Sequence, residues 1–290
     1  MVVQQAEHAF HGLKEEVNNI LLTSPTGAGK SLLFQLSAIY LAEKYGLLTI
    51  VVSPLVALMN DQVEGLHGYA GAAALNSNKT ATEKEMILQG VQNGSINILY
   101  LAPELLLSYS ITTFLGNRQL GLLVVDEAHT VTTWGRDFRV DYWFLGDYLR
   151  KSKRYLPNTF PIFALTATAV WDPTGHNDMV FDTIRSLNMD PCIKFIGVVR
   201  RENISFEIEL SHISKNYEEE RRKKTIQRIR EALLQNRKTI VYFPFRRTVN
   251  SIVYSDDISD IQNRITSYHA ALNPEEKKSM PRILGMAVNP

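Results

Sequence analysis

The chain has 290 residues, 45% of them apolar, which is enough material for a large buried core and excludes a mostly disordered protein. The 31 Lys and Arg residues nearly balance the 30 Asp and Glu residues, which excludes a nucleic-acid binder that relies on an overall basic field. The single cysteine, Cys192, excludes internal disulfides and four-cysteine zinc sites, and it is most simply a structural thiol in a reducing compartment.

Apolar stretches in the sequence are too short to cross a membrane. The longest, residues 47–59, is interrupted by Thr49, Ser53 and Pro54 and falls short of the ~20 residues that a bilayer requires. The first residues are largely polar, unlike the basic cluster and apolar run of a secretion signal. We therefore expect a soluble protein with no membrane partner, cytoplasmic and near the nucleoid in a bacterium, or nuclear in a eukaryote.

The first two-thirds of the chain repeats one pattern: a short apolar run, a loop with small or charged residues, and a longer stretch of helical periodicity. This pattern predicts an α/β fold in which helices flank a parallel sheet. The predicted strands are residues 20–23, 48–53, 96–101, 120–125 and 162–165. Since open α/β sheets bind ligands beyond the carboxyl ends of their strands, the unusual residues at those ends are candidate site residues.

A glycine-bearing loop with Lys-Ser follows the first predicted strand and precedes a helical stretch, which is the arrangement of a phosphate-binding loop. The glycines let backbone N–H groups converge on phosphate oxygens, Lys30 places a positive charge near the β and γ phosphates, and Ser31 can ligate magnesium. The common motif starts with Gly where this chain has Ser24. The residues expected to bind the nucleotide are Thr26, Gly27, Ala28, Gly29, Lys30 and Ser31.

Two adjacent acids, Asp126 and Glu127, directly follow the predicted strand at 120–125. Hydrolysis of a nucleoside triphosphate needs one carboxylate to hold magnesium and another to orient or deprotonate the attacking water. We assign the first role to Asp126 and the second to Glu127, while His129 is placed to sense the nucleotide. The simpler alternative is an acidic first turn of a helix, which the helix dipole also favours.

These residues resemble the DEAH-containing RecQ-like DNA helicases, and the resemblance extends in order over most of the chain. Residues 53–63 resemble motif Ia of that family. Residues 75–77 and 100–104 resemble the family's next segment, and residues 164–169 resemble motif III. The resemblance implies RecA-like domains that use ATP and Mg²⁺. It also implies that Ser53 and Pro54 lie against the DNA backbone and that Thr166 and Thr168 couple the nucleotide state to the grip on DNA.

The segment after Asp-Glu-Ala-His resembles the aromatic-rich loop that separates RecQ-like proteins from other helicases. In that family the loop is implied to contact single-stranded DNA. Stacking on Trp134 and Phe138 tolerates any base, and Arg136 or Arg139 can meet phosphate, which supports this role physically. The alternative is that the two aromatic residues belong to the hydrophobic core.

A second domain is expected after a change of composition. Residues 200–204 resemble the family's junction between domains, the charged stretch 211–238 is most simply a solvated helix with one buried face rather than a nucleic-acid contact, and residues 239–243 predict a buried strand. Residues 268–272 resemble that domain's next segment. We expect a first RecA-like domain at 1–205, a linker at 206–215 and the beginning of a second RecA-like domain at 216–290.

The sequence also departs from the RecQ-like pattern. The adenine-reading glutamine is matched only loosely by Gln4 or Gln5, of which Gln5 is our candidate, and residues 285–290 echo motif V faintly. Motif VI, which carries an arginine finger, is absent. Since such fingers accelerate hydrolysis by thousands-fold or more, we expect this chain to bind ATP, to hydrolyse it poorly and not to unwind DNA alone.

The expected function is an ATP-dependent DNA helicase that moves 3′ to 5′, acts on single strands and duplex junctions, and is incomplete in this chain. One alternative is an ATP-dependent DNA-binding or regulatory module whose protein partner completes the second domain. Hydrolysis that appears only on mixing with that partner would favour it. A further alternative, an unrelated ATPase such as a transporter subunit, predicts no stimulation by DNA.

Overall fold

Two compact units make up the chain in this computed structural model, Met1–Ile204 and Ser205–Pro290. The structure describes residues 1–132, 140–169, 172, 174, 178–197, 203–210 and 216–268. Within these residues, no helix is both long enough and apolar enough to span a bilayer.

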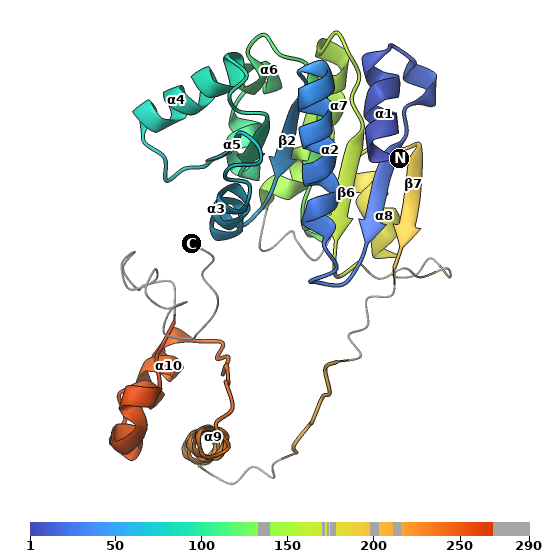
Figure 1. The fold of residues 1–290 in the computed structure, drawn as a ribbon. Helices are drawn as coiled ribbons and strands as arrows, with labels where there is room; N and C mark the ends of the chain where they lie inside the picture. Colours follow the sequence, from blue (N-terminus) through green and yellow to red (C-terminus); the bar gives the residue numbers. More distant parts are fainter. Residues whose placement is uncertain are drawn as a thin grey trace. The chain divides into compact units, whose positions relative to one another are not determined.

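A seven-stranded sheet forms the centre of the first unit, with the strand order β3-β4-β2-β5-β6-β1-β7 and parallel pairing between neighbours. The arrows of the labelled strands in Figure 1 point to one edge, where the connection from β1 to α2 also lies. The strands are β1 Asn19–Thr23, β2 Leu48–Val52, β3 Ala72–Leu75, β4 Ile98–Leu101, β5 Leu120–Val125, β6 Ile162–Thr166 and β7 Cys192–Ile196.

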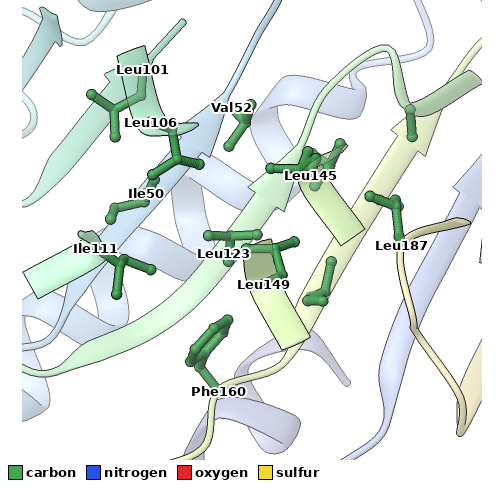
Figure 2. Packing of buried hydrophobic residues seen from close by; sticks show 14 of the residues in the cluster. Ile50, Val52, Leu101, Leu106, Ile111, Leu123, Leu145, Leu149, Phe160 and Leu187 are labelled. Carbon is green, nitrogen blue, oxygen red and sulfur yellow. The ribbon is translucent and has the colours of Figure 1, made fainter. Parts of the chain in front are cut away.

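Helices cover both faces of this sheet, because its strands direct apolar side chains to both sides. On β5, Leu123 and Val125 join one hydrophobic cluster while Leu122 and Val124 join another. Figure 2 shows the first cluster, in which Ile50 and Leu123 from the sheet lie among side chains of the covering helices. This cluster includes residues of α4 Ala81–Gln92, α5 Pro103–Ser108, α6 Ile111–Leu115, α7 Val140–Tyr155 and α8 Met179–Ser186. The other includes residues of α1 Val2–Phe10, α2 Lys30–Tyr45 and α3 Val56–Gly65.

The five predicted strands are confirmed, and two further strands at the edges of the sheet were missed. β3 consists of three alanines and a leucine, so it lacks the β-branched residues that mark strands in a sequence. β7 contains Lys194 and exposes Phe195 and Ile196, unlike a strand buried on both faces. Both segments become strands through pairing with β4 and β1, and that pairing depends on tertiary structure.

The second unit contains α9 Tyr217–Leu234, α10 Arg246–Val253 and the 3₁₀ segment η4 Asp256–Arg264. Three buried isoleucines form its small core: Ile226, Ile252 and Ile258. The solvated helix predicted in this region is confirmed as α9, in which Ile226 is the buried residue.

The strand predicted at residues 239–243 is not formed. Within the described part of the second unit, no strand pairs with this segment, and the side chains of Ile240, Val241 and Tyr242 are exposed. A strand needs the backbone partners of a neighbouring strand, and apolar β-branched residues alone do not supply them.

The side chain of Asn19 makes hydrogen bonds that join several segments at the amino ends of the strands. Its Nδ2 donates to the carbonyl oxygen of Met189 at 2.8 Å, and its Oδ1 accepts from the N–H of Ile162 at 2.9 Å. The Lys153 ammonium also donates to Oδ1, at 3.3 Å, and burial lowers the pKa of Lys153 to about 8. One buried amide thus joins β1, the start of β6 and the turn before β7.

Asn19→Ala is expected to lower the free energy of unfolding by about 2–4 kcal/mol, because it leaves a buried N–H and a buried carbonyl unpaired. Urea denaturation followed by tryptophan fluorescence measures the change. Asn18→Ala is the matched control, since among the described residues the Asn18 side chain makes one exposed hydrogen bond, to the carbonyl of Glu16, and we expect a change below about 0.5 kcal/mol. Equal effects of the two substitutions would contradict the assigned role of Asn19.

Candidate nucleotide-binding site

The loop between β1 and α2 contains two glycines in left-handed backbone conformations. Gly27 has a φ of 84° and Gly29 has a φ of 75°. The N–H of Ala28 donates to the carbonyl oxygen of Pro25 at 3.3 Å, which closes a turn with Gly27 at its third position. A Cβ on either glycine would meet no atom within 4 Å, so backbone conformation and not space favours glycine here.

Lys30 holds this loop in shape. Its ammonium donates to the carbonyl oxygens of Ser24 at 2.8 Å and Pro25 at 3.0 Å. Lys30 is also the first residue of α2, so the partial positive charge of the helix N-terminus adds to its own. The loop therefore combines a positive potential with the N–H groups of a helix start, which is what phosphate binding requires.

Asp126 and Glu127 lie at the end of β5, on the same edge of the sheet as this loop. The N–H of Asp126 donates to the carbonyl of Val52 at 2.9 Å, and the Asp126 side chain is 8% exposed. Asp126 Oδ1 accepts from the N–H of Glu127 at 3.0 Å. Glu127 itself has a φ of 48°, a conformation that is strained for a residue with a side chain.

Burial raises the pKa of both acids. The pKa of Asp126 rises to about 6, first because the carboxyl is desolvated and second because Glu127 carries a like charge. Desolvation also raises the pKa of Glu127. The Lys30 ammonium opposes both shifts, which places the phosphate loop within electrostatic reach of the acidic pair.

His129 links the acidic pair to the end of β6. Its Nδ1 lies 3.3 Å from Glu127 Oε2 and 2.9 Å from Thr166 Oγ1. Burial lowers the pKa of His129, which favours the neutral imidazole over the ion pair that the short distance suggests. Because a carboxylate only accepts hydrogen bonds, we assign the proton to Nδ1. Thr166 Oγ1 also accepts from the N–H of Thr168 at 3.2 Å, which extends the network outward.

Contact of Ser53 and Pro54 with the DNA backbone stays a prediction, and the structure shows where the two side chains lie. Both are buried, and the N–H of Ser53 donates to the carbonyl of Leu101 at 3.1 Å, so Ser53 still belongs to the sheet. Its Oγ is buried without a hydrogen-bond partner among the described residues. The first exposed residues of this segment are Leu55 and Ala57, one and three positions beyond Pro54.

Gln5 is not brought to the phosphate loop. It is a buried residue of α1, and its Oε1 accepts from the N–H of Asn18 at 2.6 Å, just before β1 begins. The five residues of β1 then separate it from the loop by about 16 Å, because each strand residue adds about 3.3 Å. Gln5 therefore stabilises the start of β1, and its role in reading the adenine stays a prediction.

The residues expected to contact single-stranded DNA lie outside the described residues: Trp134, Arg136, Phe138 and Arg139. The 3₁₀ segment η2 Ala128–Val131 connects the acidic pair to the start of this stretch.

Two residues that contact the site were not singled out from the sequence. Gln62 on α3 donates from Nε2 to Ser31 Oγ at 3.4 Å, and Tyr142 on α7 donates to the carbonyl oxygen of Asp126 at 3.4 Å. Gln62 is within the stretch that resembles motif Ia, which was the available signal, but only folding brings it to a residue 31 positions earlier.

The residues at this edge of the sheet fit a nucleoside triphosphate with magnesium. Asp126 is a buried carboxyl whose negative charge a cation would stabilise, and the loop offers Lys30 and the Ser31 hydroxyl. Within the described residues, no cluster of three or more His, Cys, Asp or Glu could hold a metal. Magnesium in phosphate-loop proteins does not need such a cluster, because phosphate oxygens and water complete its ligands.

Asp126→Asn is expected to stabilise the nucleotide-free fold by on the order of 2 kcal/mol at pH 7.5. The folded-state pKa of about 6 lies above the ordinary aspartate pKa of 3.8, so Asp126 lowers the stability of the fold as the pH rises through this interval. Denaturation in EDTA at pH 7.5 and pH 4.5 measures the effect. The difference between Asp126→Asn and the unmodified chain must shrink at the lower pH, and a constant difference would contradict the burial argument.

Comparison with known proteins identifies the family. Residues 4–174 match the DEAD/DEAH box helicase family model. The ATP-dependent DNA helicase RecQ of Pasteurella multocida is 32% identical over 267 residues, which cover 90% of this chain and 38% of that relative. The probable ATP-dependent DNA helicase RecS of Bacillus subtilis is 37% identical over 187 residues, covering 64% and 34%. The chain thus spans less than half the length of these curated relatives.

The solved structures support the fold. The crystal structure of the DUF1998 helicase MrfA bound to DNA aligns with a TM-score of 0.67 at 16% identity, covering 96% of this chain and 40% of that one. The expected α/β RecA-like fold is therefore confirmed, as is the resemblance to RecQ-type relatives. Since the matched family model covers more than half of its residues, the chain belongs to the DEAD/DEAH box helicases.

Proposed function

We propose that this chain carries the ATP-hydrolysing part of a RecQ-type DNA helicase, which couples hydrolysis to 3′ to 5′ movement on single-stranded DNA and to duplex unwinding. One observation carries the proposal: Lys30 and the Asp126–Glu127 pair lie at one edge of the sheet, within electrostatic reach of one another. They are almost 100 positions apart in the chain. Folding alone does not require an α/β domain to place a cation, a buried carboxyl and a partly buried carboxyl together there.

Each residue has a distinct role in this proposal. Lys30 and the N–H groups of the loop bind the phosphates, while Ser31 and Asp126 hold magnesium, which supplies charge stabilisation at the transferred phosphoryl group. Glu127 orients the attacking water and accepts its proton on a carboxylate oxygen. Its raised pKa suits this role, because a general base works best with a pKa near the operating pH.

A series of contacts connects Glu127 to the protein surface, and in this proposal it couples the nucleotide state to DNA binding. His129 contacts Glu127 and Thr166, and Thr166 in turn accepts from the N–H of Thr168, which is exposed. A change at Glu127 therefore alters hydrogen bonds that end at the surface. We propose that DNA is contacted through Trp134, Arg136, Phe138 and Arg139, which closely follow Glu127 in the sequence.

Glu127→Gln is expected to lower the single-turnover rate of ATP hydrolysis by about 10²–10⁴-fold, because the amide cannot accept a proton. ATP binding should remain within about threefold of the unmodified chain, since Lys30 and Ser31 are unchanged. The rate is measured with excess protein, with and without single-stranded DNA. Stimulation of ATP hydrolysis by DNA would support the helicase hypothesis over an unrelated ATPase.

Glu85→Gln is the matched control for this experiment, because Glu85 is exposed on α4 and its charge is lost in the same way. It should hydrolyse ATP at the unmodified rate. Equal rates of ATP hydrolysis for Glu127→Gln and Glu85→Gln would show that Glu127 is not the catalytic base.

Thr166→Val should reduce the stimulation of hydrolysis by DNA about fivefold while leaving ATP affinity unchanged, because valine keeps the shape but breaks the hydrogen bonds to His129 and Thr168. The ratio of rates with and without DNA is the readout. Thr183→Val is the control: its hydroxyl is also lost from a buried position, but it donates to Met179 within α8. Unchanged stimulation in Thr166→Val would exclude this route.

A further inference from the structure

Gln62 is a polar side chain at the phosphate loop with no role in the function proposed above. It lies on α3, and its Nε2 donates to Ser31 Oγ at 3.4 Å, a long hydrogen bond. Its Oε1 is buried and has no hydrogen-bond partner among the described residues. Buried amide oxygens are rarely left unpaired in folded proteins, so this atom calls for an explanation.

The chemistry of the Ser31 hydroxyl explains why a buried acceptor lies beside it. A serine hydroxyl has one hydrogen to donate and two lone pairs. If Ser31 Oγ held magnesium through a lone pair, its hydroxyl hydrogen would remain and could be donated to an acceptor. Gln62 Oε1 is a buried acceptor without a partner, on the side chain that already contacts Ser31.

By turning its amide, Gln62 can hydrogen-bond to the Ser31 hydroxyl both with and without magnesium at Ser31. The nitrogen and oxygen of a glutamine amide occupy nearly equivalent positions, and a half-turn about χ3 exchanges them. With Nε2 toward Ser31, the amide donates to a hydroxyl that holds no metal. With Oε1 toward Ser31, the amide would accept the hydroxyl hydrogen and leave the lone pairs of Ser31 Oγ available to magnesium.

We propose that Gln62 is a positioning residue of the nucleotide site, which accepts the Ser31 hydroxyl hydrogen and thereby orients Ser31 toward magnesium. This inference rests on the proposed function, because it requires a magnesium nucleotide at the phosphate loop. It makes α3 part of the metal site. The exposed residues Leu55 and Ala57 lie where that helix begins.

Gln62→Leu removes both hydrogen-bonding groups while keeping the approximate size of the side chain. We expect the Mg²⁺ concentration for half-maximal binding of a non-hydrolysable ATP analogue to rise about tenfold, as for other outer partners of metal ligands. Binding of the same analogue in EDTA should change less than about twofold. The analogue carries a fluorescent label, so the readout is anisotropy and does not depend on turnover.

Two variants separate positioning from a structural role. Gln62→Glu keeps an acceptor for the Ser31 hydroxyl and should stay within about threefold of the unmodified Mg²⁺ requirement. Glu64→Gln, at an exposed position on the same helix, is the matched control and should leave it unchanged.

A double-mutant cycle with Ser31→Ala provides the decisive measurement. If Gln62 acts through the Ser31 hydroxyl, Gln62→Leu should raise the Mg²⁺ requirement of the unmodified chain but not that of Ser31→Ala. Additive effects would overturn the proposal, as would equal losses with and without Mg²⁺. Failure of the unmodified chain to bind the analogue at all would instead overturn the proposed function, together with the inference that rests on it.

Discussion

Parallel pairing of β1, β6 and β5 is the constraint on which the rest of the site depends. The registers Thr23↔Thr166 and Val125↔Ala164 bring the carboxyl ends of these three strands to one edge of the sheet. The phosphate loop, Thr166 and the acidic pair each follow directly from one of those ends. Their proximity is therefore a property of the backbone ladder, and a shift of register would separate them even if every side chain were retained.

The same site carries features that do not favour folding. Asp126 is desolvated beside a like charge, Glu127 has a left-handed backbone, and the Gln62 amide oxygen lacks a partner among the described residues. At the opposite edge of the same sheet, the buried Asn19 amide is well paired. Several strained or desolvated groups at one edge of a well-packed sheet are characteristic of functional sites, where ligand binding relieves the strain.

How much could be predicted from sequence follows from the range of the interactions involved. The inner strands can be predicted from continuous apolar runs, such as residues 120–125, because a strand that is buried on both faces needs apolar side chains at every position. The phosphate loop is equally local, because its glycines and Lys30 act within eight residues. Edge strands β3 and β7 depend on their neighbours for pairing, and residues 239–243 have strand-like composition without a described partner.

The amino-acid sequence by itself determined the α/β class, the phosphate loop and the acidic pair, because each depends on residues adjacent in the chain. Tertiary structure alone decided which side chains reach the site. It buried Ser53 within the sheet, held Gln5 at the far end of β1, and brought Gln62 to Ser31. Exposure and contact between distant residues are set by how the layers pack, and local patterns carry no information about that packing.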